Sequence, residues 1–144
     1  MTSVAETKER VQRFLTQLAS VNIDEHSRYS IQHESARVFV EVEEFGDEQT
    51  WVRITCPLLF GVTFTPEVYE YVALHSDDYK YGILGLRPDP DAEGTGGIFL
   101  TYGLLGTTLD PDELKLAVGM LVTTGNDLDD ELKEKFGGER FHEE

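Results

Sequence analysis

Cys56 is the residue of this chain whose type most directly suggests nucleophilic chemistry, because it is the single cysteine. It lies between Thr55 and Pro57 in the most apolar stretch of the sequence, and Arg53 is the one nearby cation that could favour a thiolate. Unpaired cysteines in apolar surroundings are mostly buried. The sequence also contains no Gly-x-Ser-x-Gly segment that would mark a nucleophilic serine. The pattern therefore predicts a structural Cys56 and no catalytic nucleophile.

Two short segments begin like ion-binding loops but do not complete the pattern. Asp89, Asp91, Glu93 and Gly94 have the spacing that opens a calcium loop, but the twelfth position, which needs a bidentate glutamate, holds Leu100. The glycines after this segment precede a predicted strand instead of opening a helix, and no lysine accompanies them, which argues against a phosphate-binding loop. The four histidines lack the spacing of a zinc motif. We therefore expect no metal and no cofactor.

Carboxylates are so numerous that an acid–base pair cannot be selected by sequence, since burial is what distinguishes a catalytic carboxylate. The chain has 28 acidic residues. We expect the protein not to be an enzyme, and a hydrolase built from scattered carboxylates stays open as a third hypothesis.

Length and charge exclude several classes of protein. The chain has 144 residues and a formal charge of −16, from 12 basic and 28 acidic side chains. This length suits one domain, residues 1–144, and the acidic surface would repel nucleic acid. The first residues are too charged for a signal peptide, and no stretch reaches the ~18 apolar residues of a membrane helix. We therefore expect a cytoplasmic protein that neither binds nucleic acid nor inserts into a membrane.

Apolar residues spaced three and four positions apart predict three helices. The first covers residues 3–20 and begins with Ser3 and Glu6, which have the spacing of a capping box. The second covers residues 65–78 and the third residues 110–136, each with a proline directly after its capping residue. Two glycines follow the third helix and are expected to end it.

Alternating apolar residues and turn signals predict five strands, over residues 28–34, 36–45, 51–60, 79–86 and 97–104. Pro57 cannot donate a hydrogen bond, so we expect pairing to change there. The order of elements is therefore α-β-β-β-α-β-β-α. It predicts a single α+β domain with an antiparallel sheet packed against helices.

Two apolar runs, over residues 58–64 and 99–105, place apolar side chains on both alternating faces of their predicted strands. Either both faces are buried within the monomer, or one face accepts a peptide strand or a second subunit. The residues that we predict for such a partner-binding surface are Leu58, Leu59, Phe60, Phe64, Phe99, Tyr102, Leu104 and Leu105.

Four segments carry a family resemblance: Trp51-Val-Arg-Ile-Thr-Cys-Pro-Leu-Leu, Thr65-Pro-Glu-Val-Tyr-Glu-Tyr-Val-Ala-Leu, Leu104-Leu-Gly-Thr-Thr-Leu-Asp-Pro-Asp-Glu-Leu and Asp129-Asp-Glu-Leu-Lys-Glu-Lys-Phe-Gly-Gly. The chain resembles the actinobacterial YbjN-like proteins, which are grouped with the CesT-type secretion chaperones as peptide-binding chaperones. The resemblance implies the same α-β-β-β-α-β-β-α fold. It also implies a non-enzymatic role in holding peptide segments of client proteins, often as a homodimer.

These observations favour a chaperone-like or adaptor module that binds client proteins or peptide segments. The acidic charge predicts basic clients. The alternative is a small-molecule-sensing regulatory domain, with a pocket between the sheet and the long C-terminal helix where Gly119 and Gly125 would make room.

Overall fold

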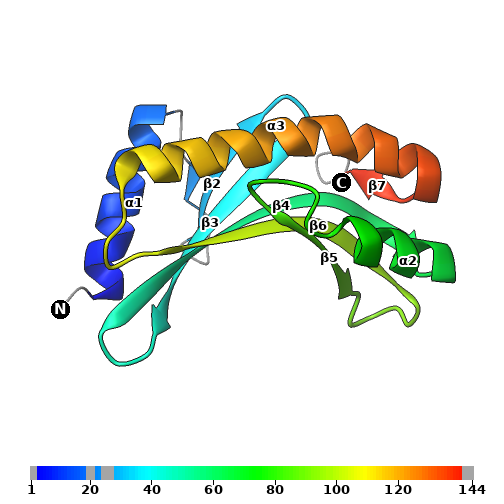
Figure 1. The fold of residues 1–144 in the computed structure, drawn as a ribbon, viewed down its shortest axis with the longest axis horizontal. Helices are drawn as coiled ribbons and strands as arrows, with labels where there is room; N and C mark the ends of the chain where they lie inside the picture. The colour runs from blue at the N-terminus through cyan, green and yellow to red at the C-terminus, as the bar shows by residue number, and fades with distance from the viewer. Residues whose placement is uncertain (1–2, 19–21, 24–27, 141–144) are drawn as a thin grey trace.

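A computed structural model of the chain describes residues 3–18, 22–23 and 28–140. The elements are α1 (Val4–Leu18), β1 (Asn22–Ile23), β2 (Tyr29–His33), β3 (Ala36–Phe45), β4 (Gln49–Thr63), α2 (Pro66–His75), β5 (Ile83–Pro88), β6 (Thr95–Leu105), α3 (Pro111–Phe136) and β7 (Glu139–Arg140) (Figure 1). The predicted order is confirmed, and the two-residue strands β1 and β7 are additions to it. Residues 19–20 of the first predicted helix, as well as His26 and His142, lie outside the described residues.

Strand β4 lies at the centre of the sheet, whose order is β1-β2-β3-β4-β6-β5 with antiparallel neighbours. The short strand β7 pairs with β4 at Leu59 and Phe60, beyond the last residue that β3 pairs with. The register between β4 and β6 shifts between Pro57 and Leu59, as the missing proline N–H predicts. A central strand is flanked on both sides, which explains why β4 is the most apolar segment of the chain.

Side chains cap all three helices at their first turn. Ser3 accepts a hydrogen bond from an α1 amide at 3.1 Å, Thr65 from an α2 amide at 3.3 Å, and Asp110 from an α3 amide at 2.8 Å. These bonds satisfy amides that have no partner within the helix. Gly137, with a φ of +75°, ends α3. The predicted helix starts and the predicted end of α3 are confirmed.

The predicted strand over residues 79–86 begins later than the sequence pattern indicates, at Ile83. Gly82 has a φ of +113°, outside the extended region, and a Cβ there would lie 2.7 Å from a leucine side chain of β6. Tyr79 and Tyr81 give the segment its alternation, but they pack against the core from outside any strand. The prediction is wrong for residues 79–82, because ring packing rather than sheet pairing explains the alternation.

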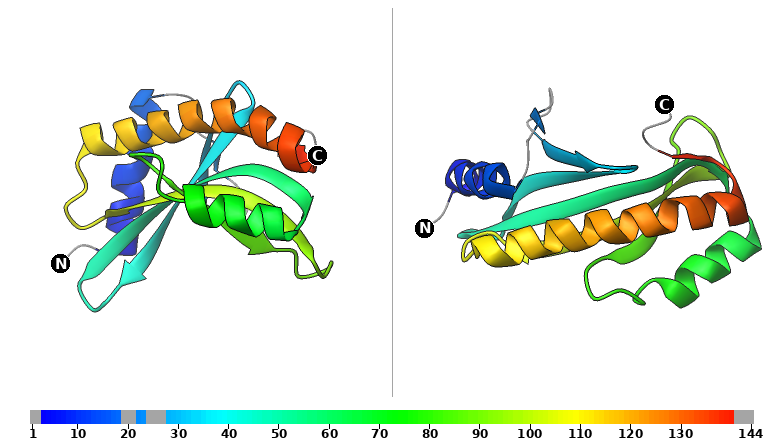
Figure 2. Two further views of the ribbon diagram at one scale, coloured as in Figure 1. Left: turned by 45° about the vertical axis from the view of Figure 1, so that its right-hand side comes forward. Right: turned by 90° about the horizontal axis from the view of Figure 1, so that it is seen from above.

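The helices pack on one face of the sheet, which we call the core face. In the right-hand view of Figure 2, α3 runs alongside the sheet and α2 lies on the same side. Buried side chains of α1, α2 and α3 form a single cluster with alternate strand residues such as Val40, Ile54 and Leu100. A Cβ on Gly125 would lie 2.6 Å from the Cys56 sulfur, so α3 packs closely on β4. The expectation that Gly125 makes room for a small-molecule pocket is therefore wrong.

Candidate functional site

The opposite face of the sheet, which we call the open face, carries aromatic and basic side chains. Strand pairing places Phe39 beside Thr55, Pro57 beside Phe99, and Trp51 beside Leu105 on this face. Phe39 and Phe99 are buried, yet neither belongs to the cluster that packs against the helices. The open face comprises Arg28, Arg37, Phe39, Glu41, Glu43, Phe45, Trp51, Arg53, Thr55, Pro57, Phe60, Ile83, Arg87, Phe99 and Leu105.

Two arginines lie over aromatic rings near the middle of the open face. The Arg28 guanidinium carbon lies 4.7 Å from the centroid of Phe39, and that of Arg87 lies 4.5 Å from the centroid of Phe99. Phe60 packs edge-on against Phe99, with 5.5 Å between the ring centroids. These contacts help to hold Phe39 and Phe99 at only 7% and 9% exposure. The open face therefore shields its rings partly with arginine side chains.

A hollow of about 210 Å³ lies among these residues. Both arginines, their rings, Phe60 and Thr55 line it. Thr55 is 4% exposed, and its hydroxyl has no hydrogen-bond partner among the described residues. A buried hydroxyl without a partner is uncommon, since leaving one costs about 1–3 kcal/mol. The hollow thus combines apolar walls with two arginines, Glu41 and a buried threonine.

The margins of the open face expose large apolar side chains. Phe45 is 50% exposed, Ile83 58% and Leu105 37%. Phe45 packs edge-on against Trp51 at a centroid distance of 5.4 Å. Trp51 lies across Gly103, where an added Cβ would come within 2.1 Å of the indole, so only glycine fits beneath it. The result is an apolar, aromatic surface that an extended chain could contact.

The structure divides the predicted partner-binding residues between the two faces. Phe60, Phe99 and Leu105 lie on the open face. The others belong to the core cluster or pack against it: Leu58, Leu59, Phe64, Tyr102 and Leu104. Apolar residues of the central strands point to both faces of the sheet. An apolar run in the sequence therefore does not identify one continuous surface.

Sequence reasoning missed four open-face residues that line the hollow: Arg28, Phe39, Thr55 and Arg87. Phe39 alternates with the core valines of β3, and this alternation could have placed it on the outer face. The arginines carry no such signal, because a charged residue on a strand usually indicates only exposure to solvent.

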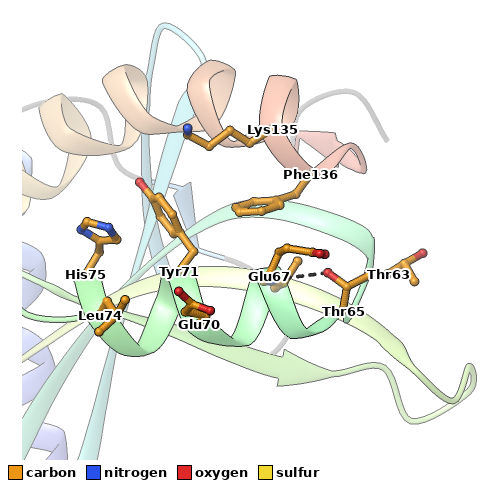
Figure 3. A pocket seen from close by; sticks show the side chains of 10 residues that line it. Thr63, Thr65, Glu67, Glu70, Tyr71, Leu74, His75, Lys135 and Phe136 are labelled. Carbon is orange, nitrogen blue, oxygen red and sulfur yellow. Dashed lines mark hydrogen bonds between the residues drawn. The ribbon is translucent and has the colours of Figure 1, made fainter.

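A second hollow, of about 630 Å³, lies between α2 and the C-terminal end of α3 (Figure 3). Tyr71 is its central side chain, packed against Phe136 at 5.4 Å and against His75 at 4.5 Å between ring centroids. The Lys135 ammonium lies 5.9 Å from the Tyr71 ring centroid. Burial raises the pKa of Tyr71. Most of its lining belongs to α2, and the rest comes from Thr63 of β4, from Thr65, and from Lys135 and Phe136 of α3.

Cys56, the candidate nucleophile of the sequence, lies in unreactive surroundings. Cys56 is fully buried, and burial raises the pKa of its thiol to about 12, so it is no nucleophile at neutral pH.

No group of three or more His, Cys, Asp or Glu side chains suited to a metal occurs in the described part of the chain. Within residues 3–18, 22–23 and 28–140, no helix combines the length and hydropathy that a membrane crossing requires.

Comparisons with known proteins agree with this architecture. The family model for TY-Chap1, described as T3SS (YopN, CesT) and YbjN peptide-binding chaperone 1, matches residues 5–144. The crystal structure of the ExsC–ExsE complex matches with a TM-score of 0.60 at 15% identity, covering 90% of this chain and 95% of that chain. The HopA1–SchA chaperone–effector complex matches with a TM-score of 0.58 at 11% identity, covering 90% and 99%. No curated protein matches the chain.

Proposed function

The chain belongs to the TY-Chap1 family of peptide-binding chaperones, a family without enzymatic activity, and we propose that it holds extended segments of client proteins on its open face. The observation that carries this proposal is a sheet face whose aromatic rings and exposed aliphatic side chains are not part of the helix-packed core. Large exposed apolar patches on soluble proteins commonly mark interaction sites. A strand-like client segment would present alternate side chains to such a face.

Solved structures of the same fold support a polypeptide client. ExsC is in complex with ExsE, and SchA is in a chaperone–effector complex with HopA1. By analogy, the occupant of the open face is a segment of another protein and not a metabolite. The buried, high-pKa Cys56 is consistent with a binding module, since such a thiol is chemically inert.

Substitutions at the margin of the open face test this proposal. We expect Ile83→Ser combined with Leu105→Ser to weaken binding of fluorescein-labelled peptides rich in Val, Ile and Phe by about tenfold or more, because both lost side chains contribute apolar contact area. Fluorescence anisotropy measures the dissociation constants. Leu116→Ser on α3 is the matched control, because Leu116 is 51% exposed but lies outside the open face. Equal weakening by Leu116→Ser, or no binding to the wild type, would contradict the proposal.

We also propose that the protein forms a homodimer through α2. Tyr69 is 53% exposed and Leu74 is 66% exposed on this helix, and Leu74 lines the second hollow. Light scattering should give about twice the chain mass of 16.3 kDa for the wild type, and the single-chain mass for Leu74→Asp. Leu105→Asp is the control on the open face and should remain a dimer. A monomeric wild type would refute the dimer without affecting peptide binding.

We place the protein in the cytoplasm, because a chain with one cysteine needs no oxidising compartment to fold. The actinobacterial branch of the family is the proposed origin, and it rests on the resemblance of the four sequence segments alone.

A further inference from the structure

We infer that the open face binds a lysine or arginine side chain of the client segment at its β3–β4 hairpin end, beside Phe45, Trp51 and Glu44. This inference rests on the proposed binding of client peptides to the open face, and it names a residue type that the client must carry. It gives a location to the expectation of basic clients, which the total charge alone does not supply.

Two aromatic rings form the apolar wall of this site. Phe45 and Trp51 line a hollow of about 390 Å³ at the hairpin end of the open face. The two rings meet edge-on at a centroid distance of 5.4 Å, and the indole also packs against Gly103, where no larger residue fits. Phe45 is nevertheless 50% exposed. Among aromatic side chains, tryptophan attracts a cation most strongly, so these rings suit a basic side chain.

Charged side chains border the two rings. Glu43, Glu44 and Arg53 line the same hollow. Arg53 donates to Glu43 at 2.8 Å, so these two charges offset each other. Glu44 is exposed and forms no ion pair within the described part of the chain, so it gives the hollow its net negative charge. A carboxylate beside aromatic rings favours a cation over a neutral side chain.

The surroundings of this hollow extend its negative charge. An adjoining hollow of about 440 Å³ shares Glu44 and is also lined by Glu6, Asp47 and Glu48. Residues 38–52 contain no lysine or arginine, so the hairpin itself supplies no cation to balance these carboxylates. A basic side chain that reaches the hairpin therefore meets complementary charge on more than one side.

The arginines in the middle of the open face restrict where a basic side chain can bind. Arg28 and Arg87 line the hollow at Phe39. Phe39 and Phe45 lie about 20 Å apart along β3, at ~3.3 Å per residue. This separation exceeds the Debye length of about 8 Å at physiological salt. The two arginines therefore repel a basic side chain from the middle of the face but act only weakly at the hairpin end.

The hairpin hollow is continuous with the apolar margin of the open face, which favours a client segment over a free small cation. Trp51 stands opposite Leu105 in the register of β4 and β6, and Leu105 is 37% exposed. The hairpin projects at the lower left of Figure 1. Alternate side chains of an extended segment point the same way. A client that packs an apolar side chain on Leu105 would thus place a basic side chain two positions away over Trp51.

The test compares labelled peptides of one extended apolar sequence without tryptophan that carry Lys, Gln or Glu at the central position. By fluorescence anisotropy, we expect the Lys peptide to bind about fivefold more tightly than the Gln peptide and the Glu peptide to bind most weakly, because a cation–π contact adds to an exposed ion pair. Trp51 is the single tryptophan of the chain, so its emission reports occupation of this hollow. Unlabelled Lys peptide should change that emission with the same dissociation constant, and unchanged emission at saturation would overturn the inference.

Glu44→Gln combined with Phe45→Leu should remove the preference for Lys over Gln, and both positions are exposed, so the fold is retained. Glu134→Gln is the matched control, because Glu134 is exposed on α3 and its replacement removes the same charge from the −16 chain. This control should keep the full preference, and an equal loss would assign the preference to total charge and overturn the inference. Equal affinities of the wild type for the three peptides would also overturn it and leave client binding intact. Failure of every peptide to bind would overturn both.

Discussion

Leu104 and Leu105 are neighbours on β6, and they show how the two faces of the sheet differ. Leu104 points into the core face and is 7% exposed, whereas Leu105 points to the open face and is 37% exposed. The sequence is equally apolar at both positions. The core face is covered by helices that close over its aliphatic residues, while the open face is partly covered by two of its own arginines. A helix over a sheet is a permanent part of the fold, but a surface arginine can rearrange when a partner arrives.

Each face also holds one buried side-chain polar atom without a hydrogen-bond partner among the described residues. On the open face it is the Thr55 hydroxyl, and on the core side it is Oδ1 of Asp129 in α3. Thr55 lines the hollow of about 210 Å³ on the open face. Asp129, on α3, is only 2% exposed. The two unpaired groups therefore differ in their surroundings, because Thr55 borders a hollow whereas Asp129 is enclosed by the packed side of the molecule.

Replacing Leu104 and Leu105 separately is expected to give the largest difference in stability between the two faces. Leu104→Ala should lower the free energy of unfolding by about 2–5 kcal/mol, because it removes buried methyl groups and leaves a cavity. Leu105→Ala should change it by no more than about 0.5 kcal/mol. Urea unfolding followed by circular dichroism measures both values. Similar losses for the two variants would show that the open face is as closely packed as the core face.

Two glycines of α3 allow a packed position and an open position to be compared within one helix. Gly125 faces the core, where a Cβ would lie 2.6 Å from the Cys56 sulfur, whereas Gly119 has open space around it. Gly125→Ala should be destabilising, because overpacking costs about 1–3 kcal/mol and exceeds the roughly 1 kcal/mol that alanine gains in a helix. Gly119→Ala should stabilise the protein by roughly 0.5–1 kcal/mol. Thermal unfolding measures both, and a stabilising Gly125→Ala would contradict the close packing of α3.

The sequence allowed most of the fold to be predicted, because helix caps and hydrophobic periodicity are local signals. Val38, Val40 and Val42 alternate with Phe39, Glu41 and Glu43, and residues 36–45 form β3 with the predicted bounds. The Asp110 cap marks the start of α3. The prediction of a strand is wrong for residues 79–82, because Tyr79 and Tyr81 alternate for packing against the core without forming a strand.

The open face was harder to predict, because its composition depends on pairing between distant strands. Arg28, Thr55 and Arg87 line the same hollow only through the register of β2, β3, β4, β6 and β5. No local pattern encodes that register. Leu58 and Leu104 were assigned to a binding surface because a strand that is apolar on both sides does not reveal which side the helices cover.

Replacing Asp129 measures how much stability the unpaired group on the core side costs. We expect a smaller change in stability than for the leucine or glycine variants. Burial raises the pKa of its carboxyl, and the Asp130 carboxylate raises it further, while hydrogen bonds from Ser35 and the Asp130 backbone and the charge of Arg140 lower it. A carboxyl whose pKa is higher in the folded state binds more protons there than in the unfolded state. Its contribution to stability therefore falls as the pH rises from about 4, the unfolded value, through the folded pKa.

Asp129→Asn should remove this loss of stability at higher pH, because the amide cannot ionise. We expect the melting temperature of the variant to exceed that of the wild type at pH 7, and the two to converge as the pH falls toward the unfolded pKa. Asp127→Asn is the control, because Asp127 is exposed on the same helix and its replacement removes the same charge from the −16 chain. If Asp129→Asn instead lowers the melting temperature at pH 7, its hydrogen bond with Ser35 outweighs the desolvation of the carboxylate. The Asp129 carboxylate would then stabilise the fold in spite of its unpaired oxygen.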